Sequence, residues 1–154
     1  MMYDNRSQKN YSNNKPSAPV KKPPLDKLTY VKQAESVIRD EIQKDIHNRN
    51  NPNKPKLSTS QIRNILTMTN ELYNTVRFEK DEKLTDELRS HIQYTKMKIA
   101  YNAGRDDIVK DFVKNSCLMQ YLDEVGDSRD KLITFCHYAE ALVAYHKFYG
   151  GDDK

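Results

Sequence analysis

The stretch PKLSTSQIRNIL, residues 55–66, carries the clearest structural signal in this sequence. Ser58 is followed three residues later by Gln61, which is the spacing of a capping box, where each side chain binds the backbone N–H of the other residue. Leu57 and Ile62 stand at the two positions of a hydrophobic staple, on either side of the helix start. The stretch therefore predicts a helix that begins at Ser58.

Apolar residues recur at helical spacing from residue 25 onward, and no stretch alternates for long enough to predict a strand. In the first helix this spacing includes Leu28 and Val31. The last helix is apolar around much of its circumference, which is typical of the central helix of a bundle. Short connections predict that sequence neighbours pack antiparallel. We therefore expect an all-α fold, a compact five-helix bundle, with helices over residues 26–47, 58–78, 85–103, 107–124 and 127–149, the third ended by Gly104 and the fourth by Gly126.

Residues 1–24 differ from the rest of the chain in composition and charge. They hold five basic groups and one acid, which leaves 21 basic and 21 acidic groups for the other 130 residues. The segment is rich in Asn, Lys, Ser and Pro, and it has too few apolar side chains to offset the entropy of ordering. We expect a disordered basic tail over residues 1–24 and a single helical-bundle domain over residues 25–154, a length that suits one domain.

The sequence offers no motif for catalysis or for binding a metal ion or cofactor. It lacks the glycine-rich phosphate-binding motifs and the GxSxG elbow of hydrolases. The histidines form no HExxH and no CxxC accompanies them, so we expect no metal site, no cofactor and no catalytic residue. Asp106 and Asp107 stand at an expected helix start, where carboxylates complement the helix dipole, and we interpret them as structural.

The cellular location of the protein is inferred from two features that its sequence lacks. No apolar run approaches the length of a membrane span, and the first residues have no apolar signal-peptide centre. We expect a cytoplasmic protein without a membrane partner. Cys117 and Cys136 lie within apolar helical patterns, where buried free thiols are more common than a disulfide.

Basic and acidic residues are segregated along the chain. No acid lies between Asp45 and Glu71, and none lies between Glu87 and Asp106. Basic residues within or just after these stretches include Lys56, Arg63, Lys96, Lys98, Arg105, Lys110 and Lys114. Since residues 25–154 carry no net charge, any basic surface on the bundle must arise from this segregation.

Tyr94, Lys98, Tyr101 and Arg105 are spaced by four, three and four residues, so they form one helical stripe that alternates ring and cation. Such a stripe can meet phosphates with its charges and bases or sugars with its rings. It is also compatible with a solvated helix face whose tyrosines cover the edge of the bundle, and the spacing by itself slightly favours that interpretation. Spacing alone leaves both interpretations open.

Several phrases carry a more specific signal. LSTSQIRNIL (57–66), ELYN (71–74), IQYTKMKIAYNAGR (92–105), VKDFV (109–113) and FCHYAEALVAYHKFYGG (135–151) together resemble the small subunit of the type III-A CRISPR effector, the Csm complex. The resemblance extends over residues 28–151 in the same order. It implies a non-catalytic helical subunit, present in several copies along the subunits that carry the crRNA and facing the channel for guide and target RNA.

The resemblance also implies which side chains contact RNA. Arg63, Lys96, Lys98 and Arg105 match the basic positions of the family, whereas His137 stands where relatives often have a basic residue. Together with the charge pattern, the expected RNA-binding set is Lys56, Arg63, Lys96, Lys98, Arg105, Lys110 and Lys114. The implied partners are crRNA, target RNA, other subunits of the Csm complex and further copies of this chain.

A second hypothesis belongs to a different class. The chain would be a helical adaptor that binds only protein, with Tyr101, Tyr121 and Tyr145 as interface anchors, because aromatic residues are enriched at interfaces. The RNA-binding hypothesis predicts that loss of Tyr101 and loss of Arg63 have different effects, whereas the adaptor hypothesis predicts the same assembly defect.

Overall fold

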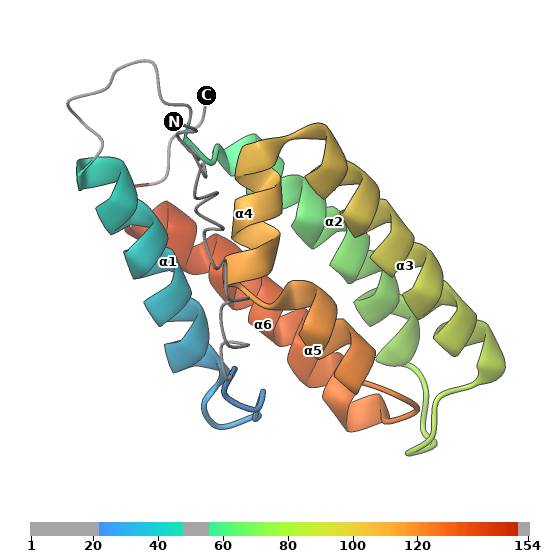
Figure 1. Cartoon of the computed structure of the whole chain (residues 1–154). Coiled ribbons are helices and arrows are strands. Elements are labelled where there is room, and N and C mark those ends of the chain that lie inside the picture. Colours follow the sequence, from blue (N-terminus) through green and yellow to red (C-terminus); the bar gives the residue numbers. More distant parts are fainter. Residues whose placement is uncertain (1–21, 48–55, 151–154) are drawn as a thin grey trace, which may run out of the picture.

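The computed structural model describes residues 22–47 and 56–150, and these residues form an all-α fold (Figure 1). The helices are α1 (Tyr30–His47), α2 (Thr59–Val76), α3 (Asp86–Arg105), α4 (Asp107–Asn115), α5 (Leu118–Glu124) and α6 (Arg129–Phe148). Within these ranges the only β-pairing is an isolated bridge between Lys83 and Ser128. The all-α prediction is confirmed. The predicted tail lies outside the described residues up to residue 21, and the division into tail and single domain stays a prediction.

The expected count of five helices was wrong in one segment, because the predicted helix over residues 107–124 is two helices, α4 and α5. Cys117 separates them with φ = 57° and ψ = 27°, the left-handed conformation. An L-residue in this conformation cannot continue the right-handed helix, so the hydrogen-bond ladder is interrupted and the chain changes direction.

Gly104 does not end α3, contrary to the prediction. The helix continues through Arg105, and its C-terminal boundary is Asp106, which is extended with φ = −147° and ψ = 116°. The backbone of Asp106 leaves the helical conformation, so α3 ends there. The Asp106 side chain then caps the N-terminus of α4, which starts at the next residue. Gly126 does have a positive φ of 57°, and it follows α5 as expected.

The first helix also starts later than predicted. Residues 26–29 form a turn in which the N–H groups of Thr29 and Tyr30 both donate to the Asp26 carbonyl. Leu28 is 83% exposed and Val31 is also exposed, so the buried face of α1 begins only at Ala34.

Helix α6 is the central element of the bundle, as its apolar circumference predicted. It packs along α1 on one side and along α2 on the other, and α3 covers the far side of α2 (Figure 1). The Tyr138 hydroxyl donates to the Ser116 carbonyl at 2.7 Å, and His146 Nε2 lies 3.2 Å from the Leu57 carbonyl oxygen. Helix α2 thus lies between α6 and α3, and these two contacts join α6 to the residues beside α4 and α2. None of the described helices has the length and apolarity of a membrane span.

Candidate nucleic-acid interface

The start of α2 is fixed by the predicted capping box. The Gln61 N–H donates to Ser58 Oγ at 3.1 Å, and the Ser58 N–H donates to Gln61 Oε1 at 2.9 Å. Leu57 and Ile62 are both buried, as their staple positions require. Arg63 lies two residues after Gln61 on α2, and it is exposed. The cap therefore presents Arg63 from a rigid element.

Gln61 has a second role that the sequence did not reveal. Its Nε2 donates to Asp106 Oδ2 at 2.6 Å, and Asp106 Oδ1 accepts the Ile108 N–H at 3.0 Å. Asp106 thus caps α4, as its structural interpretation predicted, and it also joins the N-terminus of α4 to that of α2. We call this hydrogen-bonded pair, Gln61 and Asp106, the cap junction.

Four of the predicted basic residues lie within five sequence positions of Gln61 or Asp106. All four are exposed: Lys56, Arg63, Arg105 and Lys110. Lys114 lies one turn beyond Lys110 on the exposed face of α4. None of Lys56, Arg63, Lys110 and Lys114 forms an ion pair with another residue in the described ranges. Their charges are therefore available to an external anion.

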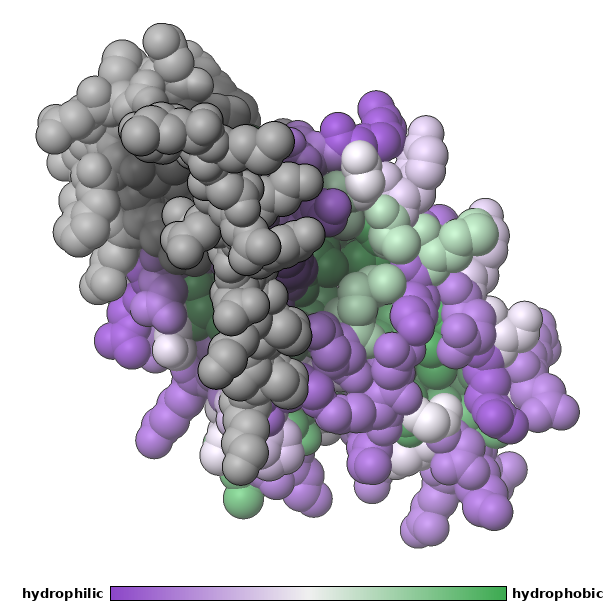
Figure 2. All heavy atoms as spheres, in the orientation of Figure 1, coloured by the Kyte–Doolittle hydropathy of each residue, from purple (hydrophilic) through white to green (hydrophobic). Residues whose placement is uncertain are grey.

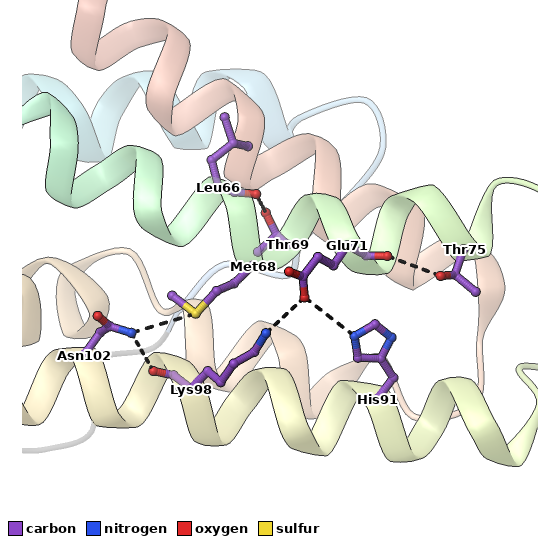
Figure 3. Close-up of polar contacts among 8 residues, drawn as sticks. All are labelled: Leu66, Met68, Thr69, Glu71, Thr75, His91, Lys98 and Asn102. Atoms are coloured by element: carbon purple, nitrogen blue, oxygen red, sulfur yellow. Dashed lines mark hydrogen bonds and ion pairs between the residues drawn. The ribbon is translucent and has the colours of Figure 1, made fainter.

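Lys98 has an acidic partner within the bundle. Figure 3 shows Glu71 extending from α2 between two side chains of α3, with Lys98 Nζ 3.0 Å and His91 Nε2 4.0 Å from Glu71 Oε2. Lys98 itself is only partly exposed. Its charge is therefore balanced locally by Glu71.

Lys96 lies on the opposite flank of α3. Its Nζ is 2.5 Å from Asp123 Oδ1, so it is directed toward α5 and away from the side that Lys98 shares with α2. The structure therefore does not bring Lys96 and Lys98 onto one face, although they are two residues apart in sequence. Their roles in RNA binding stay a prediction.

The predicted stripe of α3 is present as an exposed face. Tyr94 is 55% exposed and Tyr101 is 65% exposed, and Met97 lies between them on the same side. Lys98 Nζ lies 5.1 Å from the ring centroid of Tyr94, and Arg105 Cζ lies 5.6 Å from that of Tyr101. Each ring therefore has a cation beside it at a distance typical of cation–π contacts.

A polar pocket of about 200 Å³ adjoins the end of this stripe. It lies between α2, α3 and the start of α4, and it is lined by Gln61, Asn64, Asn102, Arg105, Asp106 and Val109. Asn64 Nδ2 donates to Asn102 Oδ1 at 3.0 Å across the two helices. Amide, carboxylate and guanidinium groups are thus grouped beside Tyr101. This pocket could not be predicted from sequence spacing, because its lining comes from α2, α3 and the start of α4.

Other residues singled out by the sequence do not join this surface. Tyr121, an anchor in the adaptor hypothesis, is buried, and its hydroxyl donates to the Pro23 carbonyl at 2.7 Å. His137 is half-buried, with its ring centroid 5.5 Å from that of Tyr73 and 6.1 Å from that of Tyr30. Neither side chain faces solvent in the manner of the cations at the cap junction.

The described residues contain no cluster of three or more His, Cys, Asp or Glu side chains that could hold a metal ion. Cys117 and Cys136 are free thiols. Burial raises the pKa of the Cys136 thiol to about 12. Burial is also the main cause that raises the pKa of Cys117, opposed by Lys22 and assisted by Glu124. Both thiols are therefore protonated near neutral pH and are weak nucleophiles.

Comparison with known proteins gives one consistent family. The protein family described as Csm2 Type III-A matches residues 32–152 of the chain. A protein of Mycobacterium tuberculosis named CRISPR system Cms protein Csm2 is 40% identical over 125 residues, which cover 81% of this chain and 94% of that protein. The protein of the same name from Streptococcus thermophilus is 38% identical over 124 residues, covering 80% and 93%. The one from Enterococcus italicus is 38% identical over 95 residues, covering 60% and 68%.

These matches include α2, α3, α4 and the cap junction, so they apply to the surface described above. They agree with the phrases in the sequence that resemble the small subunit of the Csm complex. The chain belongs to the Csm2 family, the small subunits of type III-A CRISPR effector complexes.

Proposed function

We propose that this chain is a non-catalytic subunit that stacks in several copies along the crRNA and target RNA of its effector complex. It contacts the nucleic-acid backbone through basic side chains, and it works in the cytoplasm beside other Csm subunits. The observation that carries this proposal is the group of exposed cations around the cap junction, which have no ion-pair partner among the described residues.

A backbone-binding role suits this chemistry. In an RNA-guided complex, base pairing selects the target, so a protein subunit needs only to recognise charge and shape. Arg63 is the residue best placed for phosphate contact, since a guanidinium can bind phosphate oxygens with two parallel N–H groups and its helix is fixed by the capping box. Lys56, Arg105, Lys110 and Lys114 would extend the contact along the strand.

Lys96 and Lys98 can take part only by exchanging partners. Lys98 would leave Glu71, and Lys96 would leave Asp123. Because partly exposed ion pairs contribute only about 0–1 kcal/mol, a phosphate can replace the carboxylate at little cost. We therefore rank these two lysines behind the residues at the cap junction.

The test is charge reversal of Arg63 in the assembled complex, followed by measurement of target-RNA affinity at several salt concentrations. Arg63→Glu should weaken binding, and it should reduce the slope of log K against log salt concentration by roughly 0.7–0.9 per lost phosphate contact. Lys80→Glu is the matched control, because Lys80 is exposed in the connection at the other end of α2. Intact assembly with unchanged affinity and slope for Arg63→Glu would overturn the site.

The adaptor hypothesis keeps one supporting observation, which is the exposure of Tyr101. It predicts that Tyr101→Ala and Arg63→Glu both reduce incorporation of the chain into the complex. The proposed function predicts instead that Arg63→Glu leaves incorporation intact and reduces only RNA affinity. Quantifying both co-assembly and RNA binding for each variant separates the two hypotheses.

A further inference from the structure

The outer face of α3 has a chemistry that backbone binding does not explain. Phosphate contacts require cations, yet this face alternates cations with exposed tyrosine rings. We define the α3 stripe as Tyr94, Lys98, Tyr101 and Arg105. More than half of each tyrosine side chain is exposed, although rings of this size are usually buried when they serve only packing.

A cation lies close to each ring of the α3 stripe. Lys98 lies one helical turn after Tyr94, and Arg105 lies one turn after Tyr101, with cation-to-centroid distances of 5.1 Å and 5.6 Å. Each pair combines a π surface with a positive charge a few ångströms away. This is the combination that single-stranded nucleic acids meet in binding channels, where bases stack on rings and phosphates lie against cations.

The separation of the rings restricts what can bind. Tyr94 and Tyr101 are two helical turns apart, which corresponds to about 10.5 Å along the helix axis. That is roughly three times the rise per nucleotide of a stacked strand. The two rings therefore cannot hold neighbouring stacked bases, and each would take a base that is splayed out of the strand.

The electrostatic surroundings favour an anionic partner over a protein. No acid lies on α3 between Glu87 and Asp106. The nearest carboxylates are already engaged, Glu71 with Lys98 and Asp106 with Gln61 and the α4 cap. Tyr, Met and Arg are also enriched at protein interfaces, so the anionic partner is favoured by the absence of acids on this face and not by its rings. In Figure 2, hydrophilic residues cover most of the coloured surface, and apolar residues reach it in several smaller places, one of them beside the upper half of α3.

The polar pocket beside Arg105 adds groups that can bind a base edge or a ribose. Asn64 and Asn102 supply amide donors and acceptors, and Arg105 supplies donors at the end of the α3 stripe. A nucleotide placed against Tyr101 would have these groups within the adjoining pocket. RNA recognition commonly uses such a combination of stacking and polar edge contacts.

We propose that the α3 stripe binds unpaired nucleotides of RNA, with Tyr94 and Tyr101 stacking against bases. Arg105 meets an adjacent phosphate directly, and Lys98 meets one by exchanging Glu71 for it. The inference rests on the proposed function and deepens it, because it adds base contacts to backbone contacts. It also assigns a role to two tyrosines that the charge pattern alone leaves unexplained.

The experiment compares two RNA probes with the full-length chain at low salt. One is a fluorescein-labelled oligouridylate, and the other is an abasic oligomer of the same length and charge. The Tyr94→Leu, Tyr101→Leu double variant keeps apolar, helix-forming side chains but removes the rings. We expect it to lose roughly tenfold to a hundredfold in affinity for the oligouridylate and to bind the abasic oligomer as the wild-type chain does. The corresponding double Phe variant should keep the wild-type preference.

The outcomes separate this inference from the proposed function. Arg63→Glu should reduce the affinity for both probes equally, because the two probes carry the same number of phosphates. If the wild-type chain binds both probes equally in a salt-dependent manner, stacking is wrong and backbone binding stands. If it binds neither probe, this inference is overturned, whereas the proposed function is decided by the Arg63→Glu measurement in the assembled complex. If the Leu variant keeps its preference for the oligouridylate but no longer co-assembles with other effector subunits, the stripe is a protein interface and this inference is overturned.

Discussion

Gln61 on α2 donates a hydrogen bond of 2.6 Å to Asp106, the residue that caps α4. The same Gln61 side chain closes the capping box with Ser58, so two helix starts are held by one continuous set of hydrogen bonds. Arg63 lies two residues after Gln61, and Arg105 directly precedes Asp106. The capping hydrogen bonds therefore fix the backbone positions from which these two exposed side chains extend.

Gln61→Glu tests the cap junction without removing the capping box, because glutamate serves equally well at the third helical position. The variant places a second carboxylate against Asp106 and removes the donor between the helices. We expect the free energy of unfolding to fall by about 1–3 kcal/mol at neutral pH, since a partly buried hydrogen bond to a charged group is lost and a like charge is placed beside it. Urea denaturation followed by circular dichroism measures the change.

Gln93→Glu is the control for Gln61→Glu, because Gln93 is exposed on α3. It should change stability by no more than about 0.5 kcal/mol. Combining Gln61→Glu with Asp106→Asn removes the repulsion, so part of the lost stability should return in a double-mutant cycle. Equal stability of Gln61→Glu and the wild-type chain would show that the bond between the helices contributes nothing.

Substitutions at Cys117 test the energetic cost of the left-handed turn between α4 and α5. With φ = 57° it occupies a conformation that glycine adopts freely and that costs an L-residue about 1–2 kcal/mol. We therefore expect Cys117→Gly to be more stable than Cys117→Ala by about 1 kcal/mol. Ala100→Gly, on the exposed side of α3, should have the opposite sign and cost about 0.5–1 kcal/mol. Finding the alanine variant at position 117 to be the more stable would contradict the left-handed assignment.

Three of the helix starts were predictable because their chemistry is local. Ser58, Thr85 and Ser128 each accept a backbone N–H from the residue three positions later, and these residues mark the predicted starts. The break at Cys117 had no comparable signal, since the residue is neither glycine nor asparagine. The Ser116 carbonyl beside it accepts a hydrogen bond from Tyr138 on α6, a contact that sequence spacing does not reveal.

The candidate site also has features that local sequence predicts and features that depend on packing. The acid-free stretches pointed to Arg63 and Arg105, which are exposed in the structure, because charge is a property of each residue. Which cations are neutralised depends on packing. Lys96 and Lys98 each pair with an acid 27 residues away in sequence, on different helices. The pattern therefore placed both lysines in one RNA-binding set, whereas the fold directs them to opposite flanks of α3.

Glu71 limits the availability of Lys98 to RNA. Replacing it with glutamine removes the carboxylate that lies 3.0 Å from Lys98 Nζ and frees the lysine for a phosphate. We expect Glu71→Gln to strengthen RNA binding by roughly twofold to tenfold and to steepen the salt dependence, since one more phosphate contact releases one more counterion. Fluorescence anisotropy titrations at two salt concentrations measure both effects.

Glu140→Gln is the matched control for Glu71→Gln, because it changes the net charge equally from an exposed site on α6. It should leave RNA affinity nearly unchanged. The same increase in both variants would mean that net charge, rather than the release of Lys98, explains the gain.

Cys136 gives the chain a specific dependence on alkaline pH. Its Sγ lies 3.6 Å from the Thr69 carbonyl oxygen, and burial raises its pKa to about 12. An unfolded thiol ionises near pH 8.5. The folded state therefore keeps a proton that the unfolded state releases, so stability is fully present below about pH 8.5 and is lost as the pH rises toward 12.

The expected measurement is the free energy of unfolding from pH 8 to pH 11 under reducing conditions. Each pH unit above the unfolded pKa removes about 1.4 kcal/mol of the contribution from this thiol. Cys136→Ala should be less stable at pH 8, because it leaves a cavity, but its stability should fall less steeply with pH. Tyr121→Phe provides a second, independent change of slope at higher pH, since burial also raises the pKa of Tyr121 to about 12. Parallel pH profiles for Cys136→Ala and the wild-type chain would show that the buried thiol does not control the alkaline limit.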